Sequence, residues 1–240
     1  MQEYKIIEKA LKEKYPYRTE LHAHTKKAST CADFEPEEVI RKYKNVGYDG
    51  IVITNHFVAS NINLPKEQFL NLYFDNIDRA ISEGEKTGIK VFFGAELRFH
   101  LEKSCPMNDY LIYGSTKEDL LSYYDVCFTN LENFVKNYKK EYEVLIQAHP
   151  LRENVVAREP ELLDGYESFN LHPGHNAKIP LAVRLAQGKI ITAGTDFHHE
   201  SHEGCGAVRF KEMPKDNKDI ARLLKEKDYI LEIQGKIVLP

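Results

Sequence analysis

Apolar and polar positions along the chain follow two alternating patterns. Short apolar runs, typical of buried strands, cover residues 19–24, 50–54, 90–96, 110–113, 144–148, 166–170 and 189–193. Between them lie segments with helical spacing, at 3–14, 36–46, 66–86, 117–140 (with a break near Phe128), 177–187 and 219–227. A pair of terminal strands is expected after the last helix. Strands that alternate with helices predict a parallel sheet covered by helices.

Seven strand–helix units favour an α/β fold with a closed or nearly closed β/α barrel. An open doubly wound sheet is the alternative, because periodicity alone does not separate the two. Pro36 stands in the first turn of its predicted helix, and Gly47 and Gly88 end two others. No repeat, low-complexity tract or Pro/Ser-rich linker divides the chain, so residues 1–240 are expected to form a single domain.

The charge balance argues against several classes of partner. The formal net charge is -4, so no global basic field recruits nucleic acid or an anionic membrane. No stretch approaches the ~18 apolar residues of a membrane span, and the charged segment 1–14 lacks the apolar run of a signal peptide. We therefore expect a cytoplasmic protein that does not bind membranes and does not bind extended nucleic acid.

The cysteines show no sign of a disulfide framework. They form no Cys-x-x-Cys pair and are expected to be free thiols, at Cys31, Cys105, Cys127 and Cys205.

Side chains that can bind metal follow the predicted strands at their carboxyl ends, where β/α barrels place their active sites. The first strand carries His22 and His24, two positions apart and therefore on one face. Later strands end at the remaining members of the set, His56, Glu96, His149, Asp196 and His198.

Each of these residues has an ordinary explanation when taken alone. Two inward histidines can form a polar core pair, His56 can cap a helix, and His149 can sit in a turn before Pro150. Glu96 is harder to explain, because a carboxylate at a buried strand end costs several kcal/mol unless it is paired or bound to metal. Imidazole and carboxylate together suit Zn, Mn or Fe better than Ca or Mg.

The order and spacing of these motifs resemble the PHP (polymerase and histidinol phosphatase) family of metal-dependent phosphoesterases. The matching segments span roughly residues 18–210 and read LHAHT at 21–25, PEE at 36–38, GIVITNH at 50–56, GAE at 94–96, AHP at 148–150 and GTDFH at 194–198. The resemblance implies a distorted seven-stranded (β/α)7 TIM-like barrel that binds two or three divalent metals, Zn, Mn or Fe.

Carried over position by position, the resemblance also implies roles. His22, His24, Glu96 and Asp196 would hold the first metal. Glu96 would bridge to a second metal with His149, and a third would take His56 and His198. His149, Asp196 and His198 are the expected catalytic residues.

The chain departs from the family pattern at several positions. The family usually offers His or Asp about six residues after His24; here Thr30 stands there, with Cys31 and Asp33 as candidate substitutes. Ser115 and Thr116 stand where a His often follows the strand before Gly114. Asn55 replaces a more usual Asp and is expected to alter the orientation of His56.

Three further residues are candidates for substrate binding. Arg98 lies just past Glu96, where its planar fork could hold a phosphate. His172 and His175 leave the sixth strand at the same rim. For each of the three, a surface ion pair or a simple turn is the ordinary alternative. His100, His199 and His202 are expected at the solvated surface.

The expected function is hydrolysis of phosphoesters by metal-bound hydroxide, with a small phosphorylated substrate such as a phosphomonoester. Histidinol phosphatase activity is implied by one branch of the family only. The alternatives are a nucleotide or oligonucleotide phosphodiesterase or exonuclease, and a degenerate barrel that binds metal for regulation. An amidohydrolase also places His-x-His on its first strand, but usually needs a strand lysine where this chain has Glu96.

Overall fold

The fold is known from a computed structural model that describes residues 2–58, 61, 63–102 and 107–240. Its helices are α1 (Gln2–Lys14), α2 (Pro36–Asn45), α3 (Lys66–Thr87), α4 (Lys117–Tyr123), α5 (Leu131–Asn137), α6 (Ile179–Leu185) and α7 (Asn217–Glu226). Its strands are β1 (Tyr17–Ala23), β2 (Gly50–Ile53), β3 (His56–Phe57), β4 (Lys90–Phe93), β5 (Ala95–Arg98), β6 (Asp109–Tyr113), β7 (Val144–Gln147), β8 (Gly165–Asn170), β9 (Ile190–Gly194), β10 (Gly206–Phe210), β11 (Tyr229–Ile233) and β12 (Lys236–Val238).

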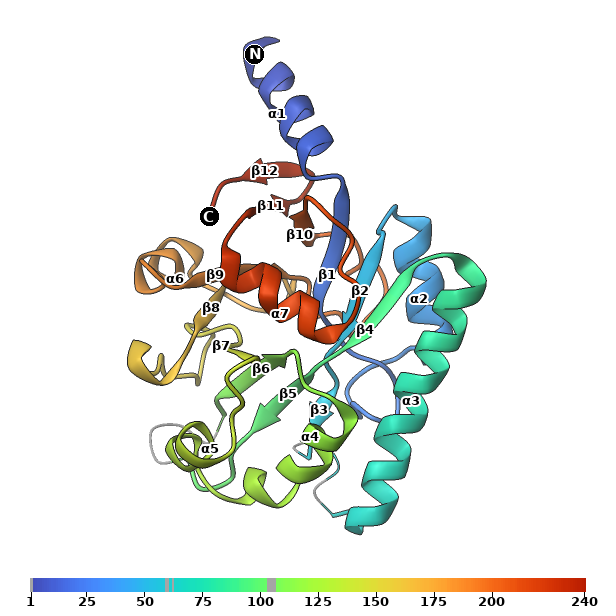
Figure 1. The fold of residues 1–240 in the computed structure, drawn as a ribbon, viewed down its shortest axis with the longest axis vertical. Helices are drawn as coiled ribbons and strands as arrows, with labels where there is room; N and C mark the ends of the chain where they lie inside the picture. Colours follow the sequence, from blue (N-terminus) through green and yellow to red (C-terminus); the bar gives the residue numbers. More distant parts are fainter. Residues whose placement is uncertain (1, 59–60, 62, 103–106) are drawn as a thin grey trace.

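The strands form two mixed sheets of six strands each, in the orders β12-β11-β10-β1-β2-β4 and β3-β5-β6-β7-β8-β9 (Figure 1). The predicted α/β class is confirmed, but the single closed seven-stranded barrel is not. One reason is β6, which runs antiparallel to both β5 and β7. Only residues 99–108 separate β5 from β6, fewer than the dozen or more that a parallel crossover needs.

The two sheets meet along a seam that the metal-competent residues occupy. The chain leaves β2 at Ile53 and enters the other sheet at His56, and it makes the same passage between Phe93 and Ala95. At Gly94 the backbone passes so close to a neighbour that an added Cβ would lie 2.3 Å from the Ile112 carbonyl oxygen. The requirement for glycine there follows from this close approach.

A short bridge joins the segment after β9 to the end of β1. The His24 N–H donates to the Phe197 carbonyl at 3.1 Å, and the Phe197 N–H donates to the His22 carbonyl at 3.3 Å. Ala23 and Phe197 pair in parallel. The His-x-His and Asp-x-His segments therefore lie side by side, although 172 positions separate His24 from Asp196 in the sequence.

The apolar faces of the helices pack against the sheets and hold this seam in place. Val39, Ile40 and Tyr43 of α2 pack with β2, and α7 packs against β6 and β10. Phe69, Tyr73 and Ile77 of α3 belong to a third cluster of buried residues. Full burial of one such side chain contributes roughly 1.5–3 kcal/mol.

Local capping explains where several elements begin and end. The predicted break near Phe128 is confirmed, because Thr116 caps α4 and Asn130 caps α5, each accepting a backbone N–H at the third helical position. Gly88 ends α3 in the left-handed conformation, with φ 73°.

Strand β10 falls where the pattern of apolar residues predicted no strand. Among the described residues, no helix is long and apolar enough to cross a membrane.

Candidate metal centre

The side chains of His22 and His24 lie on one face of β1 and its end, fully buried, with their Nε2 atoms 3.0 Å apart. Each Nε2 also lies 3.4 Å from Oδ1 of Asp196. These three residues form a group whose ligand atoms all fall within 4.8 Å of one another. Such a spacing suits one metal ion with imidazole and carboxylate ligands.

Glu96 lies at the middle of the centre, surrounded by imidazoles. Its register partner across β3 and β5 is His56, whose Nδ1 lies 2.6 Å from Oε2. On the other oxygen, His22 Nε2 lies at 3.4 Å and His149 Nε2 at 3.3 Å. His24 Nε2 lies 3.5 Å from Oε2. One carboxylate therefore faces four imidazoles.

Both oxygens of Glu96 are buried and have no hydrogen-bond partner among the described residues. The imidazole neighbours of Glu96 lie within ion-pair distance but do not meet hydrogen-bond geometry, and divalent metals bound between them and the carboxylate would satisfy both oxygens at once. Burial raises the pKa of Glu96, but the charges of His56 and His22 outweigh it, so the pKa lies well below the usual range. The residues present therefore fit a bridging position between metals.

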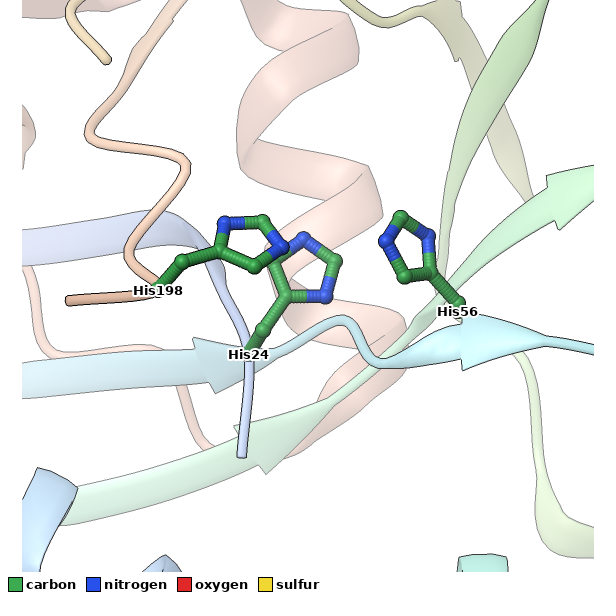
Figure 2. A group of neighbouring side chains, drawn as sticks. All are labelled: His24, His56 and His198. Carbon is green, nitrogen blue, oxygen red and sulfur yellow. The ribbon is translucent and has the colours of Figure 1, made fainter. Parts of the chain in front are cut away.

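A second group of donors consists of His24, His56 and His198, again with ligand atoms within 4.8 Å. Figure 2 shows their imidazoles converging from the end of β1, from β3 and from the segment after β9. The rings of His24 and His198 are stacked, with centroids 4.2 Å apart. The Asp196 carbonyl, 2.9 Å away, can accept a proton from His198 Nδ1, which would leave Nε2 free to bind metal.

A third group combines His56 and Glu96 with Asp109, a residue that the sequence analysis did not select. Asp109 begins β6, and the antiparallel register places it opposite Arg98 of β5. Its carboxylate lies 3.9 Å from His149 Nε2. If β6 were parallel to its neighbours, its carboxyl end near Ser115 would face the centre; because β6 is antiparallel, its amino end with Asp109 does so instead. Ser115, beyond its other end, donates to Glu143 at 2.6 Å.

Buried polar residues behind the histidines fix their orientation. Glu167 of β8 holds His22 Nδ1 at 2.8 Å and accepts the His149 backbone N–H at 3.1 Å. Ser29 contacts His24 Nδ1 at 2.9 Å. Asn55 accepts the Thr25 N–H at 2.7 Å and the Ser29 hydroxyl at 3.1 Å, so it orders the loop after β1; within the described part of the chain its side chain makes no hydrogen bond to the His56 ring. Such outer partners set the tautomer and raise the basicity of metal-binding imidazoles.

The protonation of the centre follows from this crowding of charges. Burial lowers the pKa of His22, but Glu167, Asp196 and Glu96 outweigh it and raise that pKa well above the usual value. Burial raises the pKa of Asp196, but the charge of His22 and hydrogen bonds from the neighbouring histidines outweigh burial, so this pKa lies well below the usual value. Without metal, His22 therefore holds a proton that a metal must displace.

The structure places the three predicted substrate-binding residues at the edge of the centre. Arg98 Nε and Nη2 donate to the two carboxylate oxygens of Asp109, each at 2.7 Å. His175 Nδ1 lies 3.5 Å from Asp196 Oδ2, and its ring stacks on His172 with centroids 4.0 Å apart.

The two candidate substitutes in the loop after β1 behave differently. Asp33 is largely exposed and pairs with His199 at 2.8 Å, outside all three groups of donors found in the described chain. Cys31 lies against His198 and His56. Burial raises the pKa of its thiol, but hydrogen bonding with these two imidazoles prevails and lowers it to about 6. Cys127 and Cys205 are free thiols, and Cys105 lies outside the described residues.

Comparisons with known proteins identify the family of the chain. The model of the PHP domain matches residues 20–236. A two-domain protein from Bacteroides vulgatus ATCC 8482, containing a predicted PHP-like metal-dependent phosphoesterase, superimposes with a TM-score of 0.64 at 16% identity. The match covers 91% of this chain but only 65% of that protein.

A protein from Bifidobacterium adolescentis ATCC 15703, provisionally assigned as a metal-dependent phosphoesterase, has a TM-score of 0.51 at 13% identity. That match covers 86% of this chain and 95% of the other. At such identities, these two structures show a shared fold alone. No curated protein matches the sequence. The family match, however, spans nearly the whole chain, and the chain therefore belongs to the PHP domain family.

Proposed function

We propose that this chain is a metal-dependent phosphomonoesterase that acts on a small phosphorylated molecule. The observation that carries the proposal is Glu96, a buried carboxylate whose two unpartnered oxygens face four imidazoles. Divalent cations satisfy this arrangement, and a cluster of such cations is suited to binding a phosphate group.

The proposed ligands divide among three positions. His22, His24, Glu96 and Asp196 would hold the first metal. Glu96, His149 and Asp109 would hold the second, and His56 and His198 would contribute to the third. When bound, these metals would acidify a water molecule and neutralise charge on the phosphate. In the outer layer, Glu167 and Ser29 keep the imidazoles turned toward the metals.

A cavity of about 350 Å³ beside the centre supports a small leaving group. It is lined by Met107, Arg152, Glu153, Asn154, Gly174, His175 and Asn176. Two of these residues reach the centre, because His175 lies 3.5 Å from Asp196 and Arg152 lies 3.9 Å from Asp109. The volume is at the lower end of the range for small-molecule sites.

Positive groups at the same edge are placed to meet the phosphate. Arg98 and Arg152 share the Asp109 carboxylate, and a phosphate oxygen could take up donors of Arg152 that Asp109 leaves unused. His175, between Asp196 and the cavity, is positioned to pass a proton to the leaving oxygen. His149 and His198 are committed to metals in this proposal, so they act by holding them.

The test compares hydrolysis of p-nitrophenyl phosphate with that of bis(p-nitrophenyl) phosphate, each with Mn²⁺, Zn²⁺ or Fe²⁺. We expect the monoester to be preferred, and Asp196→Asn to abolish turnover while the thermal unfolding curve is little changed. Asp125→Asn, at an exposed ion pair with Lys66, is the matched control. Preference for the diester would favour a phosphodiesterase instead, and metal binding without turnover of either ester would favour a regulatory role.

A further inference from the structure

Glu20 is a second buried carboxylate close to the centre, and the proposed chemistry does not use it. It lies in β1, two positions before His22, and its side chain is fully buried. None of the groups of metal donors found in the described chain includes it. Unlike those of Glu96, both of its oxygens accept hydrogen bonds. The role of Glu20 therefore has to be sought in the donors that it binds.

The donors to Glu20 come from three parts of the fold. On β1 itself, Oε1 accepts the backbone N–H groups of Leu21 at 3.0 Å and of His22 at 2.9 Å. From the segment after β9, Thr195 donates its backbone N–H to Oε1 at 3.0 Å and its hydroxyl to Oε2 at 2.5 Å. The Tyr43 hydroxyl of α2 donates to Oε2 at 3.0 Å. One side chain of the first sheet thus holds the end of a strand in the second sheet by two bonds.

The residue after Thr195 is Asp196, and its backbone is strained. It has a positive φ of 54°, which costs free energy for a residue other than glycine and persists only where the surroundings enforce it. In this conformation Asp196 Oδ1 lies 3.4 Å from Nε2 of both His22 and His24. Because Glu20 binds both donors of Thr195, it fixes the chain at the entry to the strained position.

We infer that Glu20 is a positioning residue for the first metal, acting through Thr195 to hold the Asp196 carboxylate against His22 and His24. This inference rests on the proposed function, because it assumes that these ligands bind a metal. The contribution of Glu20 is to accept hydrogen bonds from the backbone of both ligand-bearing segments, and its charge is not what the first metal requires.

The hydrogen bonds define which substitutions preserve this role. Three of the donors are backbone N–H groups and need an acceptor, whereas the hydroxyls of Thr195 and Tyr43 can also accept. In Glu20→Gln the amide oxygen can keep the three N–H groups, and the NH₂ group can donate to the two hydroxyls. Glu20→Met has a side chain of similar length but only a weak acceptor, so Thr195 would lose its anchor.

Competition with a chromogenic chelator measures the affinity of the full chain for Zn²⁺ without reference to turnover. We expect nearly unchanged affinity in Glu20→Gln and a loss of about 10–100-fold in Glu20→Met, the usual effect of removing an outer partner of a metal ligand. Glu143→Met is the matched control, because Glu143 is also buried and accepts hydrogen bonds from Ser115 and Tyr123 away from the centre. It should lower the thermal unfolding temperature and leave the affinity unchanged.

Unchanged affinity in Glu20→Met would overturn the inference while the metal centre stands. An equal loss in Glu20→Gln and Glu20→Met would also overturn it, because the charge of Glu20 would then matter more than its hydrogen bonds. If the parent chain binds no Zn²⁺, Mn²⁺ or Fe²⁺, the proposed function fails as well.

A double-mutant cycle separates positioning from a general loss of structure. In the Asp196→Ala background Glu20→Met should cost much less affinity than in the parent, because the carboxylate that it positions is gone. Fully additive losses would contradict the inference. Should Glu20→Met fail to fold, Thr195→Val takes its place, since it removes only the hydroxyl bond to Glu20. We expect that variant to lose up to about 10-fold in affinity, and an unchanged affinity would count against the inference.

Discussion

Glu167 offers the sharpest test of how the centre is held together. One of its oxygens contacts His22 Nδ1 at 2.8 Å. The other accepts the His149 backbone N–H at 3.1 Å and the Asn170 side-chain amide at 2.9 Å. For His22 Nε2 to bind metal, Nδ1 must carry the proton, and only a carboxylate can then accept from all three partners.

The substitution Glu167→Gln forces a choice between these contacts. If the new NH₂ group faced His149 and Asn170, two buried donors would lose their acceptor, at about 1–3 kcal/mol each. We expect the amide to turn the other way and donate to His22 Nδ1. That bond places the imidazole proton on Nε2, so His22 can no longer bind metal without breaking it.

The expected loss of metal affinity is about 10–100-fold, the usual effect of removing an outer partner of a metal-bound histidine, or roughly 1.4–2.8 kcal/mol. The assay is competition with a chromogenic chelator, with thermal unfolding of the metal-free chain measured in parallel. Glu143→Gln is the matched control, because Glu143 is also buried and accepts hydrogen bonds from Ser115 and Tyr123 away from the centre. Unchanged metal affinity in Glu167→Gln would refute the proposed orientation of His22.

Three more outcomes follow from the geometry. Asp109→Asn should lower the metal content by about one ion per chain in elemental analysis, because it removes one of the two carboxylates proposed for the second metal; unchanged content would exclude Asp109 as a ligand. Metal affinity should rise with pH in calorimetric titrations until the pH passes the raised pKa of His22, since below it a proton occupies the imidazole; an affinity independent of pH would contradict this. Gly194→Ala should destabilise the fold by about 1–3 kcal/mol in denaturant unfolding, because the added Cβ would lie 2.4 Å from Glu167 and 2.6 Å from His22; an unchanged midpoint would show that the strands relax.

The sequence was sufficient to predict most of the ligand shell. His22 and His24 share a face because side chains alternate along a strand, and Glu96 stood out because a buried carboxylate demands a partner. Asp109 was not predicted, because the pattern of apolar residues does not show the direction of a strand. The direction of β6 follows from the short connection between β5 and β6, which is too short for a parallel crossover. Glu167 was missed although its signal was present, a charged residue inside the apolar run 166–170.

The course of the chain between the sheets limited the fold prediction in a similar way. Gly94 interrupts what reads in sequence as one continuous strand, and the interruption transfers the chain from one sheet to the other. Strand β10 (Gly206–Phe210) was also missed, because it pairs antiparallel with β1 and β11 and so falls outside the pattern of parallel strands joined by helices. Both features depend on contacts between distant segments, and these decide between a closed barrel and two mixed sheets.

The seam between the two sheets gives the metals a mechanical role besides their chemical one. β1 of the first sheet and the residue after it supply His22 and His24, whereas β5 of the second sheet supplies Glu96, so the first metal would act as a cross-link between the sheets. An ion present at a hundred times its dissociation constant adds about 2.7 kcal/mol of stability. Metal depletion should therefore accelerate amide hydrogen exchange first at the seam, around residues 22–24 and 194–198, before the rest of either sheet opens.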